Sequence, residues 1–357
     1  MRTLIVSDLH LGLRTGADVL RRPEPLERLL DAIDGAQRLV LLGDTLELGT
    51  SRAREPTADA QRVLRSIGER LGPERSVIVV PGNHDGRLVR AWALSRERAL
   101  GVADEVPTEA SPGLAALASW LTPARVRVCY PGVWLGDGVW ATHGHYLDRH
   151  LVPESTFGVL RSAAARAVGR GSASALPPAR PIDYEWARRR AAARRQRRRS
   201  VRRDGFITQL RERPLGTLVQ TAAELAREGA MPQIPQLMMR ARLTSATARL
   251  ADAQMRRSAV PAMAEVARRL GVDADWIVFG HVHRLGPRDE QDWQPVAGGP
   301  RLLNTGAWLF EAMLLDQATP PHPYWPGGAV LVEPGRNPVV VGLLDGLEAD
   351  DLRGSRG

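Results

Sequence analysis

Short runs of apolar residues recur near both ends of the chain and alternate with longer segments of helical spacing. Residues 39–42 and 77–80 are apolar throughout, without the alternation of a strand that has one face in water. Unbroken runs of this kind are typical of strands that are covered on both faces. The strands predicted in this way are residues 3–7, 38–42, 76–80, 126–130, 139–142, 276–279, 301–304, 329–333 and 338–343.

Amphipathic spacing predicts helices between the first strands, at residues 25–36, 57–71 and 87–99. The last strands follow one another through turns, as at residues 335–338, and this favours antiparallel pairing between them. The pattern at the two ends of the chain therefore predicts an α/β fold.

The middle of the chain has a different character, because no strand-like run occurs from Tyr146 to about Gly271. Gly, Ser, Ala and Pro dominate residues 169–181, as in a loop or linker. Ala-rich segments with helical spacing follow at residues 215–229, 235–251 and 260–270. We therefore predict one catalytic domain in two parts, residues 1–145 and 276–357, and a mostly helical cap at residues 146–275 inserted between them.

Positive charge is concentrated in this insertion. The chain contains no lysine, so its 49 basic residues are arginines, and its formal net charge is +9. The insertion holds 25 arginines and 12 acidic residues, whereas the rest holds 24 and 28; ten of the arginines lie from Arg188 to Arg203. This run indicates a solvated helix face, contact with an anionic membrane surface or contact with nucleic acid. Aromatic residues for base stacking are sparse there, with Tyr184 and Trp186 close by.

Cysteine usage and hydropathy bear on the compartment. Cys129 is the single cysteine, which excludes an internal disulfide and fits a reducing environment. A predicted strand begins at once, with no signal-peptide pattern before it, and no apolar run approaches the roughly 20 residues that span a bilayer. We expect a cytoplasmic protein, with peripheral contact to an anionic membrane through the arginine-rich cap as a further expectation.

Five short motifs of metal-ligand residues follow predicted strands. They are Asp8-Leu9-His10, Gly43-Asp44, Gly82-Asn83-His84-Asp85, His143-Gly144-His145 and Gly280-His281-Val282-His283. Each alone occurs often by chance, but five ordinary turns would rarely all contain such residues. Residues two positions apart at a strand end point to the same side, so Asp8 and His10 can bind one ion. Carboxylate, amide and imidazole groups together suit Mn²⁺, Fe or Zn.

The order of these motifs resembles that of the calcineurin-like metallophosphoesterase superfamily, at both ends of the chain but not in its middle. The resemblance implies a four-layer αββα sandwich of two mixed sheets, here with an inserted helical cap. It also implies two divalent metal ions, for which we expect Mn²⁺, with Fe or Zn as alternatives. By resemblance, the first ion is held by Asp8, His10, Asp44 and His283, and the second by Asp44, Asn83, His143 and His281.

The activity implied by the resemblance is hydrolysis of a phosphomonoester, phosphodiester or pyrophosphate bond. Two ions clamp the phosphoryl group and lower the pKa of a shared water, and the bridging hydroxide attacks phosphorus. His84 is then the catalytic group that stabilises the transition state or protonates the leaving group, and we expect Asp85 to orient it. His145 either contacts the phosphate or shapes its turn, and Arg284 is a candidate substrate contact.

Three features bear on the substrate. Glu47 stands where much of the superfamily carries Asp, and where the UDP-2,3-diacylglucosamine pyrophosphohydrolase branch often carries Glu. Residues 304–308 also look similar to that branch. That branch usually has Arg in place of His84, which is a departure here. The cap holds five of the seven methionines, which suit irregular apolar ligands or fill gaps in a small core. We expect a phosphorylated small molecule or lipid as substrate; the alternatives are a nuclease whose cap contacts DNA or RNA, and a non-catalytic metal-binding scaffold.

Overall fold

The computed structural model describes residues 1–48, 58–136, 138–150, 178–190, 245–288, 298–312, 314–315 and 318–353, with the side chains of 245–257 left aside. The chain divides into two compact units, Met1–His145 with Ala267–Gly357, and Tyr146–Val266. Two of the predicted cap segments, residues 215–229 and most of 235–251, lie outside the described residues.

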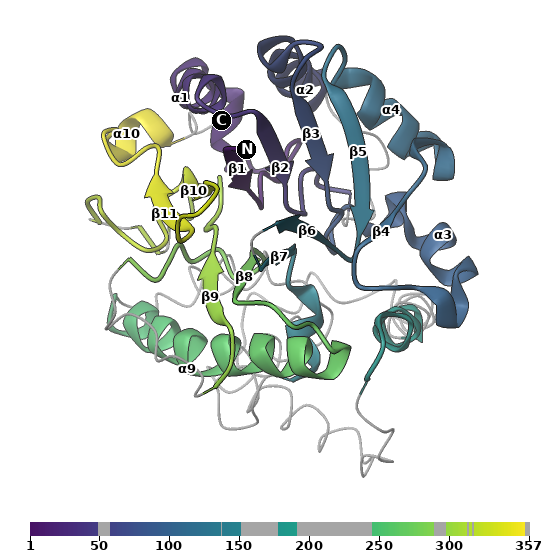
Figure 1. The fold of residues 1–357 in the computed structure, drawn as a ribbon. Coiled ribbons are helices and arrows are strands. Elements are labelled where there is room, and N and C mark those ends of the chain that lie inside the picture. The colour runs from purple at the N-terminus through teal and green to yellow at the C-terminus, as the bar shows by residue number, and fades with distance from the viewer. Residues whose placement is uncertain are drawn as a thin grey trace, which may run out of the picture. The chain divides into compact units, whose positions relative to one another are not determined.

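A seven-stranded mixed sheet forms one layer of the first unit (Figure 1). Its strands, in spatial order, are β11 (Val339–Gly342), β10 (Gly328–Val332), β1 (Thr3–Val6), β2 (Arg38–Leu41), β3 (Ser76–Val79), β5 (Arg125–Tyr130) and β4 (Asp104–Glu105). The strands β1, β2, β3 and β5 pair in parallel, while β10, β11 and β4 pair antiparallel with their neighbours. The antiparallel pairing predicted for the last two strands is confirmed.

A four-stranded mixed sheet forms the next layer, in the order β6 (Gly132–Gly136), β7 (Val139–Thr142), β8 (Trp276–Phe279) and β9 (Arg301–Asn304). The strands β7, β8 and β9 pair in parallel, and β6 pairs antiparallel with β7. The sequence pattern missed β4 and β6. The first is only two acidic residues, and the second has an apolar run of only three residues, with an exposed Trp134 at its centre and glycine at both ends.

The helices of the first unit flank the seven-stranded sheet (Figure 1). The α-helices are α1 (Pro23–Asp34), α2 (Ala58–Leu71), α3 (Arg90–Ser95), α4 (Pro112–Trp120) and α10 (Ala349–Leu352), and the 3-10 helices are η1 (Val19–Arg21), η2 (Gly86–Leu88), η3 (Glu97–Ala99) and η4 (Thr108–Ala110). The helix predicted at residues 87–99 is divided into three short pieces. Glu97, the first residue of η3, has a left-handed φ of 48°, and this separates η3 from α3.

Successive residues of the central strands enter two different cores. Leu4 and Val6 of β1 belong to the core that the sheet shares with α1, α2 and α4. Ile5, between them, belongs to a second core with residues of the four-stranded sheet such as Val139 and Val278. Because both faces of these strands are covered, consecutive positions along them are apolar. The predicted architecture of two mixed sheets with helices is confirmed.

The second unit is described at its two ends. Residues 181–190 are helical, and η5 (His145–Arg149) leads into the unit. The rings of Tyr146 and Tyr184 stack with centroids 4.4 Å apart, and the Tyr146 hydroxyl donates to Glu185 Oε1 at 2.8 Å. The helix α9 (Ser245–Leu270) begins in the second unit and ends in the first, which confirms the helix predicted at residues 260–270. No helix among the described residues is long and apolar enough to cross a membrane.

Gly68 gives a test of the packing between α2 and α4. A Cβ at this position would overlap the backbone carbonyl of Leu121, which caps α4. We expect Gly68→Ala to lower the free energy of unfolding by up to about 2 kcal/mol, because overpacking costs about 1–3 kcal/mol and the helix-propensity gain offsets about 1 kcal/mol of it. Urea unfolding measures the change, with Glu69→Ala on the exposed side of the same helix as control. A Gly68→Ala protein more stable than the native one would contradict this packing.

Candidate metal centre

The predicted ligands lie just beyond the carboxyl ends of parallel strands in both sheets. Three of the motifs follow β1, β2 and β3, which are neighbours in the first sheet, and two follow β7 and β8, which are neighbours in the second. The loops after β1 and β2 are joined by backbone hydrogen bonds, from Asp8 N–H to Gly43 O at 3.0 Å and from His10 N–H to Asp44 O at 2.8 Å. Parallel neighbours end at the same edge, so five loops distant in sequence meet there.

Left-handed backbone is concentrated at the predicted ligands. The φ angles are 55° at Asp8, 45° at His10, 50° at Asp44, 72° at His281 and 58° at His283. Among the described residues, the only other non-glycine residue with positive φ is Glu97. This conformation costs energy for residues with a Cβ, and such strain collects at functional sites.

Each of the two ligand carboxylates has one oxygen fixed by the protein and one turned towards imidazoles. Asp8 Oδ2 accepts the His281 backbone N–H at 2.9 Å. Its Oδ1 is buried, accepts no well-directed hydrogen bond and lies 3.2 Å from His283 Nε2. Asp44 Oδ1 accepts the His84 backbone N–H at 2.7 Å, while its Oδ2 lies 3.2 Å from His143 Nε2 and 3.9 Å from His10 Nε2.

The hydrogen bonds of the histidine rings assign their tautomers. His143 Nδ1 lies 3.0 Å from the carbonyl oxygen of Leu42, which can only accept, so Nδ1 carries the proton. Its Nε2 lone pair then faces Asn83 Oδ1 at 3.0 Å and the free oxygen of Asp44. Electron pairs facing one another at this distance repel, unless the ring takes a second proton or a cation lies among them.

The rings of His10 and His283 also have Nδ1 beside an acceptor and Nε2 directed into the cluster. His10 Nδ1 lies 3.0 Å from Glu47 Oε2, and His283 Nδ1 lies 2.8 Å from Glu311 Oε1. The two Nε2 atoms face each other at 3.4 Å. Acceptor atoms therefore converge from several directions, and this donor set fits divalent cations.

Three groups of side chains have their ligand atoms within 4.8 Å of one another; one joins His84 to His10 and Asp44, and the other two contain predicted ligands alone. Of these two, one group is Asp8, His10 and His283, and the other is Asp44, His143 and His281, with Asn83 beside His143. Asp44 Oδ2 lies between the groups, since it approaches a histidine of each. The structure thus brings all seven predicted ligands close together, while their division between two ions, and the ions themselves, stay predictions.

Burial and neighbouring charges shift the pKa values of the cluster in opposite directions. Burial alone raises the pKa of Asp8, but His143 and His283 outweigh it and bring that pKa to about 2. In the same way, burial lowers the pKa of His143, but Asp44 and Asp8 outweigh it and raise that pKa to about 9. Negative charge therefore dominates the cluster, and it favours whatever positive charge enters, either protons or metal ions.

Glu47 is the site residue whose role the sequence did not reveal. Its Oε2 lies 2.7 Å from His84 Nδ1 and 3.0 Å from His10 Nδ1, so one carboxylate joins the predicted catalytic residue to a predicted ligand. Burial raises the pKa of Glu47, but hydrogen bonds from His10 and His84 bring it to about 2. Burial lowers the pKa of His84, but Asp44 and Glu47 produce a net rise. The sign of this role in the sequence was that Glu47 lies in the same loop as Asp44.

Asp85 makes contacts other than the expected ones. We expected it to orient His84, but its oxygens accept backbone N–H groups, from Gly82 at 2.6 Å and from Thr45 at 2.8 Å. Buried amides need acceptors, and Asp85 supplies them for two ligand loops. Burial, followed by the charge of Asp44, raises the pKa of Asp85 to about 6. The carboxylate beside His84 is therefore Glu47, and Asp85 acts on the backbone.

His145 and Arg284 lie near the ligands without a defined function. The buried His145 ring stacks against Tyr130, with centroids 6.5 Å apart, and lies 5.5 Å from the His143 ring. Arg284 follows His283 and is buried. The expected contacts of both residues with a substrate stay predictions.

Close approach explains two glycines of the motifs. A Cβ on Gly43 would overlap the His143 ring, and a Cβ on Gly82 would overlap the Asp44 carboxylate. Glycine is therefore required for the loops to approach the ligands this closely.

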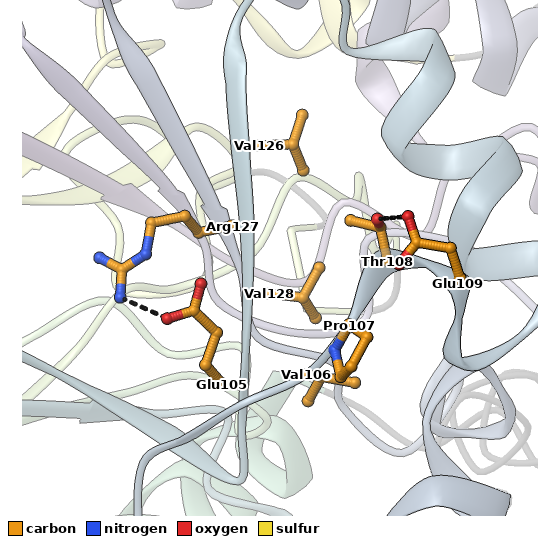
Figure 2. A pocket seen from close by; sticks show the side chains of 8 residues that line it. All are labelled: Glu105, Val106, Pro107, Thr108, Glu109, Val126, Arg127 and Val128. Atoms are coloured by element: carbon orange, nitrogen blue, oxygen red, sulfur yellow. Dashed lines mark hydrogen bonds and ion pairs between the residues drawn. The ribbon is translucent and has the colours of Figure 1, made fainter.

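A separate pocket lies at the β4–β5 edge of the first sheet and is lined by Glu105, Val106, Pro107, Thr108, Glu109, Val126, Arg127 and Val128 (Figure 2). Figure 2 shows its polar side chains paired with one another, Arg127 with Glu105 at 3.2 Å and Thr108 with Glu109 at 2.6 Å. None of the predicted site residues is among those that line it, and we assign it no role.

Comparison with known proteins finds a family match over the first part of the chain. Residues 1–165 match the family model for calcineurin-like phosphoesterases. A search of curated proteins found no match to the chain. The matched segment contains four of the five motifs, and the structure places the fifth, at His281 and His283, against Asp8 and His143.

Replacement of Asp44 tests whether its carboxylate is shared by the two ligand groups. We expect Asp44→Ala to bind fewer than two ions per chain, because removal of a shared ligand weakens both groups at once. Elemental analysis of native and variant protein measures the stoichiometry. Asp18→Ala is the matched control, since Asp18 is also a buried carboxylate but pairs with Arg21, at 2.9 Å, outside the cluster. Two tightly held ions in Asp44→Ala would contradict the shared position.

Proposed function

Residues 1–165 belong to the calcineurin-like phosphoesterase family, and from this premise we propose that the chain hydrolyses a phosphoester or pyrophosphate bond with a dinuclear metal centre. The observation that carries the proposal is the position of Asp44 Oδ2, which approaches His143 of one ligand group and His10 of the other. A carboxylate oxygen in this position can serve two ions at once. The left-handed backbone at five ligands supports a functional rather than a structural cluster.

The ligand groups define what each ion would contact. Asp8, His10 and His283 would hold one ion, and Asn83, His143 and His281 the other, with Asp44 between them. When bound, a pair of divalent ions neutralises phosphoryl charge and lowers the pKa of a water. Mixed oxygen and imidazole ligands suit Mn²⁺, Fe and Zn, and we propose Mn²⁺ as the first ion to test.

His84 is placed to handle a proton. Its backbone N–H is fixed by Asp44, its Nδ1 lies beside Glu47, and its Nε2 lies 4.0 Å from Asp44 Oδ2 at the margin of the cluster. The side chain is 10 % exposed, so it can reach a bound substrate. Against the effect of burial, Asp44 and Glu47 raise the pKa of His84, so the ring can hold protons on both nitrogens and would donate the one on Nε2 to the leaving oxygen. His84 also forms a compact group with His10 and Asp44, so its role must be separated experimentally from that of a ligand.

The substrate we propose is a phosphorylated small molecule or lipid. The described helix of the second unit, residues 181–190, exposes Trp186, Arg189 and Arg190, with the Arg189 guanidinium 5.0 Å from the Trp186 ring centroid. Arginine and tryptophan together favour the boundary between lipid headgroups and acyl chains. A nuclease remains the second candidate, because arginines also bind a phosphate backbone.

Replacement of His84 tests the chemistry. Native protein with Mn²⁺ is expected to hydrolyse at least one compound of a panel of aryl phosphates, cyclic nucleotides, nucleotide diphosphate sugars, phospholipids and DNA. His84→Ala should keep its metal content and lose activity by about 10²-fold or more, since it removes the proton donor.

The control for this variant is His322→Ala, which removes an imidazole outside the cluster. Metal content is measured by elemental analysis beside the rate. If His84→Ala lost metal together with activity, His84 would be a ligand. If the native protein bound metal but hydrolysed nothing on the panel, the scaffold alternative would replace the enzyme.

Replacement of the arginine run tests the partner. The nine arginines from Arg189 to Arg203 are changed to Gln, and Arg188 is kept because it pairs with Glu185 at 3.4 Å. Co-sedimentation with anionic vesicles should weaken, since each basic residue near the surface contributes about 1 kcal/mol. Hydrolysis of a small aryl phosphate should be largely unchanged. Equal co-sedimentation of both proteins would refute the membrane proposal, and loss of DNA binding alone would favour the nuclease.

A further inference from the structure

Both histidines of the first group of metal ligands direct Nδ1 at carboxylates, whereas His143 of the second group does not. His10 and His283, in the first group, each direct Nδ1 at a carboxylate, of Glu47 at 3.0 Å and of Glu311 at 2.8 Å. His143, in the second group, directs Nδ1 at the neutral backbone carbonyl of Leu42. A carboxylate acceptor fixes the ring and makes its other nitrogen a better electron donor than a carbonyl does.

The backbone around Glu311 is fixed on both sides. Before it, Trp308 N–H donates to Asp8 O at 3.1 Å and Phe310 N–H donates to Ala17 O at 2.8 Å, so this segment lies along the first ligand loop. After it, the carbonyl of Glu311 accepts N–H groups from Leu314 at 2.8 Å and from the buried Leu315 at 3.1 Å. The Glu311 carboxylate, only 19 % exposed, is therefore held against His283 by the fold.

The first group also carries more negative charge than the second. The first group has Asp8 as a ligand, shares Asp44, and has two further carboxylates on its histidine rings. The second shares Asp44, and its other oxygen ligand is the neutral amide of Asn83. Asp85 is close enough to raise the pKa of His143, but its oxygens accept backbone amides instead of an imidazole.

We propose that Glu311 is a positioning residue for His283 and that, with Glu47, it makes the first group the tighter and first-filled of the two metal positions. The inference rests on the proposed dinuclear centre and goes beyond it, since the two positions become unequal. The second ion is then the exchangeable one, and the occupancy of its position depends on the concentration of free metal.

Calorimetric titration of metal-free protein with Mn²⁺ tests this inference. Native protein is expected to show two classes of binding. Glu311→Ala should weaken the tighter class by about 10–100-fold, the usual effect of removing a carboxylate behind a ligand histidine, and leave the weaker class unchanged. Glu311→Gln keeps an acceptor oxygen without the charge, and its affinity should lie between those of the native and alanine proteins. Glu333→Ala, which removes a carboxylate of similar exposure paired with Arg2, should change neither class.

Thermal unfolding of the metal-free variants separates positioning from a structural effect. We expect the Tm of metal-free Glu311→Gln to equal that of the native protein. An unchanged tighter class in either Glu311 variant, or equal weakening of both classes together with a lower metal-free Tm, would overturn the inference. If Glu311→Ala does not fold, Glu311→Gln alone decides. Absence of Mn²⁺ binding by the native protein would instead refute the proposed function.

Discussion

Buried acceptor atoms that face one another are the constraint on which the rest of the first unit depends. Asp8 Oδ1 and Asp44 Oδ2 lie among the Nε2 atoms of His10, His143 and His283, and backbone and carboxylate acceptors hold the opposite nitrogens of these rings. This arrangement is unfavourable without added positive charge. Metal binding would relieve the repulsion, so metal affinity and local stability are two measures of one interaction.

The two sheets supply complementary halves of this arrangement. Loops after the first sheet provide the carboxylates and the amide, and loops after the second provide His143, His281 and His283. Their distances therefore depend on the core between the sheets, where Ile5 and Ala141 belong to one buried cluster. A cavity in that core would shift one sheet against the other and displace ligands that no substitution had touched. The apolar core behind the site and the charged cluster before it thus determine one geometry.

Much of the fold was predictable, because the central strands are buried on both faces and their sequences show it. Nine predicted strands are present, each within two residues of its predicted ends. The elements that were missed lack such a signal. β4 is two acidic residues, β6 has glycine at both ends, and α4 begins at Pro112 in a segment with few polar residues to mark a face. The division between α3 and η3 depends on the backbone of Glu97, which composition does not reveal.

The convergence of the candidate ligands was predictable, because metal binding requires particular residue types at strand ends and each of these motifs is short. The residues that support the ligands follow another rule. Asp85 is adjacent to His84 in sequence, yet its carboxylate turns to the amides of Gly82 and Thr45, because buried N–H groups take the nearest acceptor. Glu47 takes the place beside His84, and Glu311 reaches His283 from a segment with no motif. Such partners are set by which buried donors lack acceptors once the backbone is folded, and this is decided by tertiary packing instead of local sequence.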